Sequence, residues 1–117
     1  MAVIFVYATA ADRAEALRIG RAVVEARLAA CANVIDGMRS VYWWQGKLEE
    51  NAEAVLILKS TDDRLADLID QVKSLHSYDC PCIEALPVMA GNPAFLDWVA
   101  LETHRRSDDP GGLSSGR

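Results

Sequence analysis

The chain has 117 residues, of which 51% are hydrophobic, and its 12 basic and 17 acidic side chains give a formal net charge of −5. This length and composition predict one globular domain with one core, and the acidic balance argues against a nucleic-acid partner, which would need a concentrated basic surface. The apolar runs are shorter than the roughly 20 residues of a membrane-spanning helix, so we expect no membrane insertion.

The chain has three cysteines, Cys31, Cys80 and Cys82. The N-terminal segment lacks the basic region and the length of a signal peptide, so a cytoplasmic location is expected, and an odd number of cysteines argues against a disulfide framework there. The spacing of Cys80 and Cys82 differs from the C-x-x-C pattern of redox and zinc sites. Cys31 lies in an apolar run, which predicts a small buried core residue.

The first predicted elements are a strand and a helix. Residues 2–8 are apolar and rich in β-branched side chains, as expected of a buried strand. Asp12 then offers an N-cap, and Glu15 follows three residues later, which is the spacing of a capping box. Apolar residues recur at helical spacing from there, so a helix is predicted to about Leu28.

A long hairpin is predicted next. A strand is expected over residues 31–44, and Asp36-Gly37 in its middle indicates a bulge, because the apolar pattern resumes on both sides. Gln45-Gly46 closes the hairpin, since glycine tolerates the positive φ of a two-residue turn. The returning strand covers residues 47–60, and its centre, residues 54–58, is apolar on both faces, which predicts a central strand.

The remaining pattern predicts a second helix, a strand and a short last helix. Thr61 is expected to cap the second helix. A loop over residues 76–81 leads to a strand over residues 82–89, in which Pro87 indicates an edge position. Asn92-Pro93 has the cap and N1 chemistry of a helix start.

The predicted order is strand–helix–strand–strand–helix–strand, which is the split β-α-β arrangement of ferredoxin-like α+β folds. We therefore expect an antiparallel sheet with two helices on one face. The domain is expected to cover residues 1–103. Residues 104–117 are polar and Gly-rich, which is typical of a flexible tail.

Three consecutive aromatic residues, Tyr42, Trp43 and Trp44, end the second predicted strand. Neighbouring side chains of a strand point to opposite faces, and one small domain can bury only one face of so long a hairpin. Burying each ring contributes about 2–3 kcal/mol, whereas leaving several exposed would create a larger apolar patch than monomers usually carry. These residues therefore predict an interface between copies of the chain.

Sequence blocks across residues 3–101 resemble those of a known family. They are Arg27-Leu28-Ala29-Ala30-Cys31-Ala32-Asn33, Ser40-Val41-Tyr42-Trp43-Trp44-Gln45-Gly46-Lys47, His76-Ser77-Tyr78-Asp79-Cys80-Pro81, Ala85-Leu86-Pro87-Val88, Gly91-Asn92-Pro93 and Leu96-Asp97-Trp98. Their order and spacing are similar to those of the CutA family of small trimeric proteins linked to divalent-cation tolerance. The resemblance implies a cyclic homotrimer. Since no nucleophile–base pair, phosphate loop or paired carboxylates are visible, we do not expect an enzyme.

His76 and Cys82 are the candidate metal ligands. Imidazole and thiolate near carboxylates suit copper or zinc, and the alternative is that His76 caps the preceding helix by bonding its last carbonyls. In CutA-like proteins the histidine at this loop position is associated with copper, which implies a site for copper or another divalent cation here. Two further ligand positions of some relatives hold Ala8 and Leu75 in this chain, so weak binding is expected. No cofactor is predicted to be required.

A second hypothesis is a regulator similar to the trimeric PII proteins, which would bind a small ligand in a cleft between subunits and dock on another protein. The residues expected to line that cleft are Lys59, Tyr78, Asp79 and Glu84. For each of them alone, the alternative is a solvated or ion-pairing side chain.

Overall fold

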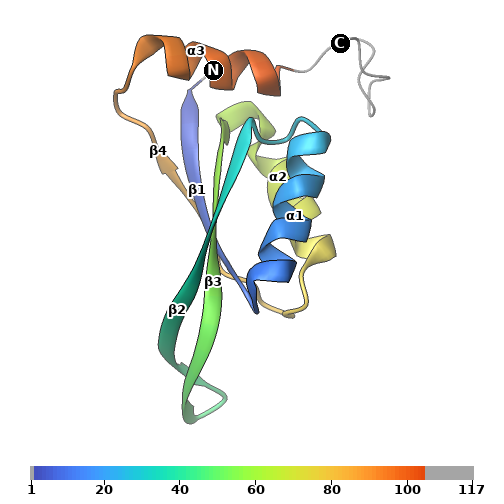
Figure 1. Cartoon of the computed structure of the whole chain (residues 1–117), viewed down its shortest axis with the longest axis vertical. Helices are drawn as coiled ribbons and strands as arrows, with labels where there is room; N and C mark the ends of the chain where they lie inside the picture. The colour runs from blue at the N-terminus through green and yellow to red at the C-terminus, as the bar shows by residue number, and fades with distance from the viewer. Residues whose placement is uncertain (1, 105–117) are drawn as a thin grey trace.

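One four-stranded antiparallel sheet carries the fold in residues 2–104, which the computed structural model describes (Figure 1). The elements in chain order are β1 (Val3–Ala10), α1 (Arg13–Glu25), β2 (Cys31–Trp44), β3 (Lys47–Thr61), the 3-10 turn η1 (Asp62–Arg64), α2 (Leu65–Leu75), β4 (Ile83–Pro87) and α3 (Pro93–Thr103). This order confirms the predicted ferredoxin-like α+β fold. Except for His104, the predicted tail over residues 104–117 lies outside the described residues.

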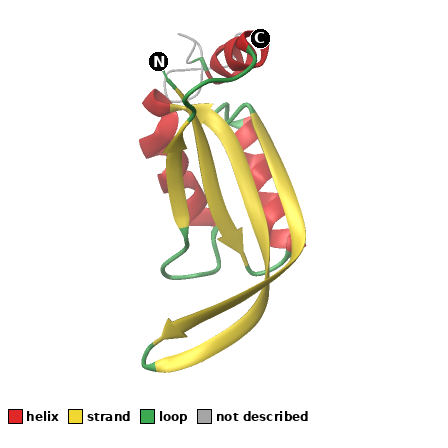
Figure 2. Ribbon diagram, turned by 90° about the vertical axis from the view of Figure 1, so that its left-hand side faces the viewer, coloured by secondary structure: helices red, strands yellow, loops and turns green. Residues whose placement is uncertain are grey.

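The strand order in the sheet is β2-β3-β1-β4, so β3 and β1 are central and β4 is an edge, as the sequence predicts. Helices α1 and α2 cover one face of the sheet, and α3 lies across one end of it (Figures 1 and 2). In the described part of the chain, no helix is long and apolar enough to cross a bilayer.

The core lies between the sheet and the two helices on its covered face. Alternate residues of β1 and β3 point into it, because side chains of a strand alternate between faces, and Val6 and Leu58 are fully buried there. Gly20 of α1 allows the helix to approach closely: a Cβ at this position would lie 3.0 Å from the Cβ of Ala32. The opposite face of the sheet has no helix over it in residues 2–104 (Figure 2).

The hairpin of β2 and β3 runs well past the end of the other strands (Figure 2). We call this projecting part, residues 38–53, the hairpin arm. It begins at the predicted bulge, where the register shifts between Ile35 and Met38 and Gly37 adopts a φ of +81°. Its tip is the predicted turn at Gln45-Gly46, where both residues have positive φ, as a two-residue turn between twisted strands requires.

Helix α1 ends at Glu25, three residues earlier than predicted. The chain turns at Arg27, which has a φ of +62°, and the Leu28 backbone N–H then donates to the Val23 carbonyl oxygen at 2.9 Å. This bond satisfies one of the carbonyl groups that the end of a helix leaves unpaired. Strand β4 is also shorter than predicted at both ends.

Two sequence predictions, for Thr61 and for Cys31, are wrong. Thr61 does not cap a helix with its side chain. It is buried, and its Oγ1 lies 3.2 Å from Oγ1 of Thr103 on α3. Cys31 is half-buried rather than a core residue, because the neighbouring Ala32 faces the core and Cys31 therefore points to the uncovered face.

The buried carboxylate of Glu15 fastens the start of α1 to the loop that follows α2. The backbone N–H of Glu15 donates to Asp12 Oδ1 at 2.8 Å, which confirms the predicted N-cap. Its own carboxylate accepts from the backbone N–H of Ala11 at 2.9 Å and of Ser77 at 2.8 Å. Burial alone would raise the pKa of Glu15, but these hydrogen bonds to the charged form outweigh burial, and the pKa is lowered.

We predict that Glu15→Gln lowers the free energy of unfolding by about 1–3 kcal/mol at neutral pH, because one buried backbone N–H loses its charged acceptor. Urea denaturation measures this difference, and Glu25→Gln, at the exposed end of the same helix, is the matched control, with an effect below about 0.5 kcal/mol. A lowered pKa contributes stability that is lost as pH falls through the folded-state value. The difference should therefore shrink in acid, and one that is unchanged there would contradict the role of the carboxylate.

Candidate functional site

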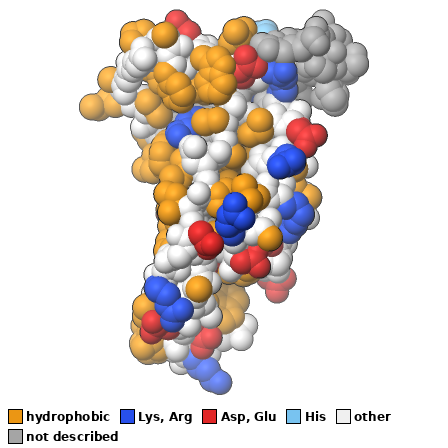
Figure 3. All heavy atoms as spheres, in the orientation of Figure 1, with side chains coloured by type: hydrophobic (Ala, Val, Ile, Leu, Met, Phe, Trp, Pro, Cys, Tyr) orange, Lys and Arg blue, Asp and Glu red, His pale blue; other side chains and the backbone are white. Residues whose placement is uncertain are grey.

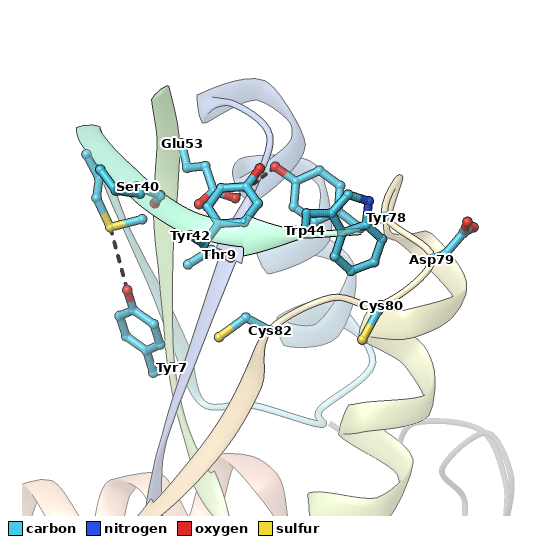
Figure 4. Close-up of a pocket in the computed structure, with 12 residues that line it drawn as sticks. Tyr7, Thr9, Ser40, Tyr42, Trp44, Glu53, Tyr78, Asp79, Cys80 and Cys82 are labelled. Atoms are coloured by element: carbon cyan, nitrogen blue, oxygen red, sulfur yellow. Dashed lines mark hydrogen bonds between the residues drawn. The ribbon is translucent and has the colours of Figure 1, made fainter. Parts of the chain in front are cut away.

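A pocket of about 570 Å³ opens between the hairpin arm, β1 and the loop before β4 (Figure 4). The residues that line it are Tyr7, Thr9, Met38, Ser40, Val41, Tyr42, Trp44, Glu53, Tyr78, Asp79, Cys80 and Cys82. The bulge in β2 creates this lining, because it sets Met38 opposite Glu53 on the uncovered face. Strand alternation then puts Tyr42 and Trp44 on that face and turns Trp43 away.

Glu53 and Tyr78 form the polar centre of the pocket. Glu53 is only 9% exposed, and its Oε2 accepts a hydrogen bond from the Tyr78 hydroxyl at 2.8 Å. Burial raises the pKa of Tyr78, and the hydrogen bond to Glu53 raises it further. Burial and the nearby Cys82 and Glu53 also raise the pKa of Tyr7. The two phenols are therefore neutral, and the surroundings disfavour additional negative charge.

His76 holds the loop against β1 with both of its ring nitrogens. Nδ1 accepts from the Tyr78 backbone N–H at 3.0 Å, and Nε2 lies 2.7 Å from the Thr9 carbonyl oxygen. These partners assign a neutral ring with its proton on Nε2. The predicted alternative, a cap on α2, is met by the backbone rather than by the ring: His76 is the C-cap residue, and its backbone N–H donates to the Lys73 carbonyl oxygen at 3.4 Å. Metal binding by His76 stays a prediction. It would require one ring nitrogen to give up its hydrogen bond and bind the metal instead.

Cys82 lies at the edge of the pocket, near Thr9 and Glu84. Cys82 Sγ lies 3.8 Å from Glu84 Oε1, and Thr9 lines the pocket beside it. Burial raises the pKa of the Cys82 thiol, and the Glu84 carboxylate raises it further, so the sulfur is a neutral thiol at neutral pH. Cys80, two residues earlier, is exposed. Within residues 2–104, no three His, Cys, Asp or Glu side chains are grouped closely enough to hold a metal ion.

The predicted cleft residues are only partly brought together. Tyr78 and Asp79 line the pocket, although the Asp79 carboxylate points outward (Figure 4). Lys59 lies elsewhere on the uncovered face and donates to Asn33 Oδ1 at 2.6 Å. Among residues 2–104, no lysine or arginine lines the pocket, so the lining does not favour a negatively charged ligand of the kind that the regulator hypothesis would allow.

The pocket residues that the sequence reasoning missed include Tyr7, Met38 and Glu53. Alternation along β1 would have placed Tyr7 on the face opposite the core. The other two meet only because of the register after the bulge, which the sequence does not specify.

The chain matches known proteins along most of its length. The sequence model of the CutA1 divalent ion tolerance protein family matches residues 4–102. A divalent-cation tolerance protein CutA from Archaeoglobus fulgidus is 42% identical over 95 residues, which are 81% of this chain and 92% of that protein. The rice Protein CutA 1, chloroplastic, is 39% identical over 100 residues, which are 86% of this chain but 56% of the rice protein.

A solved structure agrees with these sequence matches. The structure of the periplasmic divalent cation tolerance protein CutA from Archaeoglobus fulgidus has a TM-score of 0.84 to this chain and 39% sequence identity, and the match covers 87% of this chain and 99% of that one. Because the family match spans nearly the whole described part, and the relatives share both sequence and fold with it, the chain belongs to the CutA1 divalent ion tolerance protein family.

Proposed function

We propose that this chain acts in divalent-ion tolerance as a cytoplasmic homotrimer that binds a divalent cation, foremost copper, through His76 and Cys82. The observation that carries the proposal is that both side chains lie near Thr9: the His76 ring bonds its carbonyl oxygen, and Cys82 lines the same pocket as Thr9. Imidazole and thiolate are preferred copper and zinc ligands. Glu84 beside the sulfur adds a carboxylate.

The hydrogen bonds of His76 suggest how it would bind a metal. Ligation through Nδ1 displaces only the Tyr78 backbone N–H and keeps the bond from Nε2 to Thr9. A ligating histidine usually donates its other N–H to a carbonyl or carboxylate, which fixes its tautomer. The displaced loop bond and the protonated Cys82 thiol both oppose binding, so the proposed affinity is weak, in the micromolar range.

A cytoplasmic location is supported by the three free cysteines in the described residues, which suit a reducing compartment. The names of the relatives include periplasmic and chloroplastic proteins. The location of this chain is therefore proposed from its own cysteines and is not transferred from those relatives.

The proposed trimer is supported by exposed apolar side chains on the hairpin arm. Trp43 is 71% exposed and Trp44 is 49% exposed, and patches of this kind mark interfaces. Apolar side chains also gather over α3 and along the left-hand edge of the molecule in Figure 3. Strands β2 and β4 are the two edge strands of the sheet, and they differ from each other. Contacts between unlike surfaces close into rings, so a cyclic assembly suits this geometry.

We predict that replacing both Trp43 and Trp44 with Ser converts the trimer to monomers, because the substitution removes the largest exposed apolar groups of the arm. Light scattering at micromolar concentration gives the mass. Leu17→Ser, which changes an exposed apolar residue on α1, is the control and should leave the trimer intact. A monomeric mass for the unmodified chain would refute the proposed assembly.

We predict that His76→Ala and Cys82→Ser each weaken Cu²⁺ or Zn²⁺ binding in calorimetry at least about tenfold, whereas Cys31→Ser does not. Affinity should fall in acid, because protons compete with a metal for its ligands. It should rise in mild alkali, since the raised pKa of Cys82 keeps the thiol protonated at neutral pH and a metal binds the thiolate. If His76→Ala binds copper as tightly as the unmodified chain, the ring only anchors the loop.

A further inference from the structure

Cys80 and Cys82 are two thiols separated by a single residue, Pro81, on the loop that leads into β4. Cys80 is exposed and Cys82 is half-buried, and both are free cysteines. Figure 4 shows both side chains on this loop, with their sulfur atoms toward the same side of it in that view. The proposed function uses only Cys82, so it gives no role to the exposed thiol beside it.

Pro81 limits the distance between the two cysteines. The proline ring holds its own φ at about −65° and keeps the preceding residue, Cys80, extended. Two extended residues separate the Cα atoms of Cys80 and Cys82 by about 6–7 Å, which is at the upper end of the span of about 4.4–6.8 Å that a disulfide tolerates. A metal ion between the sulfurs, with two bonds of about 2.3 Å, spans more than a direct S–S bond. The pair is therefore better spaced for a shared metal ion than for a disulfide.

The number of donors near these thiols selects the metal ion. Zn²⁺ takes four ligands in a tetrahedron, and Cu²⁺ favours a square-planar set. Within residues 2–104, however, no three His, Cys, Asp or Glu side chains are grouped closely enough to hold a metal ion. Cu⁺ is a soft ion that thiolates select, and two thiolates on opposite sides of it complete a linear coordination. A reducing compartment, which is the location proposed above, also keeps copper in this oxidation state.

We propose that Cys80 and Cys82 together bind one Cu⁺ ion as thiolates, each losing its proton to solvent as the bond from sulfur to copper forms. The proposal rests on the proposed function, in which Cys82 binds copper, and it adds the oxidation state of the ion and a second sulfur ligand. No electron is transferred, because the ion arrives and stays as Cu⁺. The bound pair carries one net negative charge, which water can screen because Cys80 is exposed.

The proposed site does not need the hairpin arm to be uncovered. Both ligands belong to the loop between α2 and β4, outside residues 38–53 of the arm. The rings of Tyr42 and Trp44, which line the pocket from the arm, can be covered in the proposed trimer without removing either sulfur. An ion held by two bonds to one loop also requires no enclosed volume.

Binding by the two thiols leaves the anchors of the loop in place. Both hydrogen bonds of the His76 ring are kept, whereas ligation by the imidazole exchanges one of them. On the other side, the contact between Cys82 Sγ and Glu84 Oε1, which is 3.8 Å long, is given up. A weak contact of this length costs little to replace. The thiol pair is therefore the less disruptive place for copper on this loop.

The test is competition for Cu⁺ between the full chain and bicinchoninate, a chelator that is coloured when it holds Cu⁺, under nitrogen with ascorbate. We expect the unmodified chain to remove one Cu⁺ per chain. Cys80→Ser and Cys82→Ser should each lower the affinity more than about a hundredfold, because losing a group that merely supports a ligand already costs about 10–100-fold. Cys31→Ser is the matched control and should bind Cu⁺ as the unmodified chain does. Light scattering should give every variant the same mass.

Three results would overturn the proposal. Undiminished Cu⁺ binding by Cys80→Ser would show that Cys80 is not a ligand, and failure of the unmodified chain to remove Cu⁺ from the chelator would show that the thiols form no site. A large loss of Cu⁺ affinity in His76→Ala would show that the imidazole is the second ligand instead. Calorimetry with Cu²⁺ separates these failures from that of the proposed function, which stands if Cu²⁺ binding depends on His76 and Cys82.

Discussion

The β2–β3 hairpin is too long for the sheet to which it belongs, and the exposed surface of the molecule follows from this mismatch. β2 and β3 have 14 and 15 residues, whereas β1 has 8 and β4 has 5. The covering helices and neighbouring strands end before the arm does, so one chain cannot bury both faces of the arm. The exposed Trp43 on one face and the pocket on the other are two consequences of the same excess length.

The pocket also depends on a loop that is held by polar anchors rather than by a core of its own. His76 bonds Thr9 on β1, and Glu15 bonds Ser77. Both anchors are buried or half-buried, and a polar group in such surroundings contributes most when it is fully bonded. The imidazole of His76 therefore serves to hold the loop in place. A metal at His76 has to compete with a bond that positions Tyr78.

Local signals in the sequence predicted much of the fold because each reflects short-range chemistry. The N-cap at Asp12, the bulge at Asp36-Gly37 and the turn at Gln45-Gly46 were all confirmed. Predictions about side-chain environment were less successful. Thr61 looked like a helix cap, but its hydroxyl meets Thr103, which is 42 residues away in sequence. Cys31 looked like a core residue from the apolar run around it, but the register of β2 places it on the uncovered face.

The candidate site illustrates the same limit. Tyr78 and Asp79 could be named from their loop, and both line the pocket. Glu53 could not, because an acidic residue at the start of an apolar strand segment is typical of a solvated strand end. The burial of Glu53 depends on Met38, which the bulge in β2 sets opposite it, and on Tyr78, which comes from a distant loop. Contacts between distant segments are set by register, and a bulge of one residue changes which face each later side chain occupies.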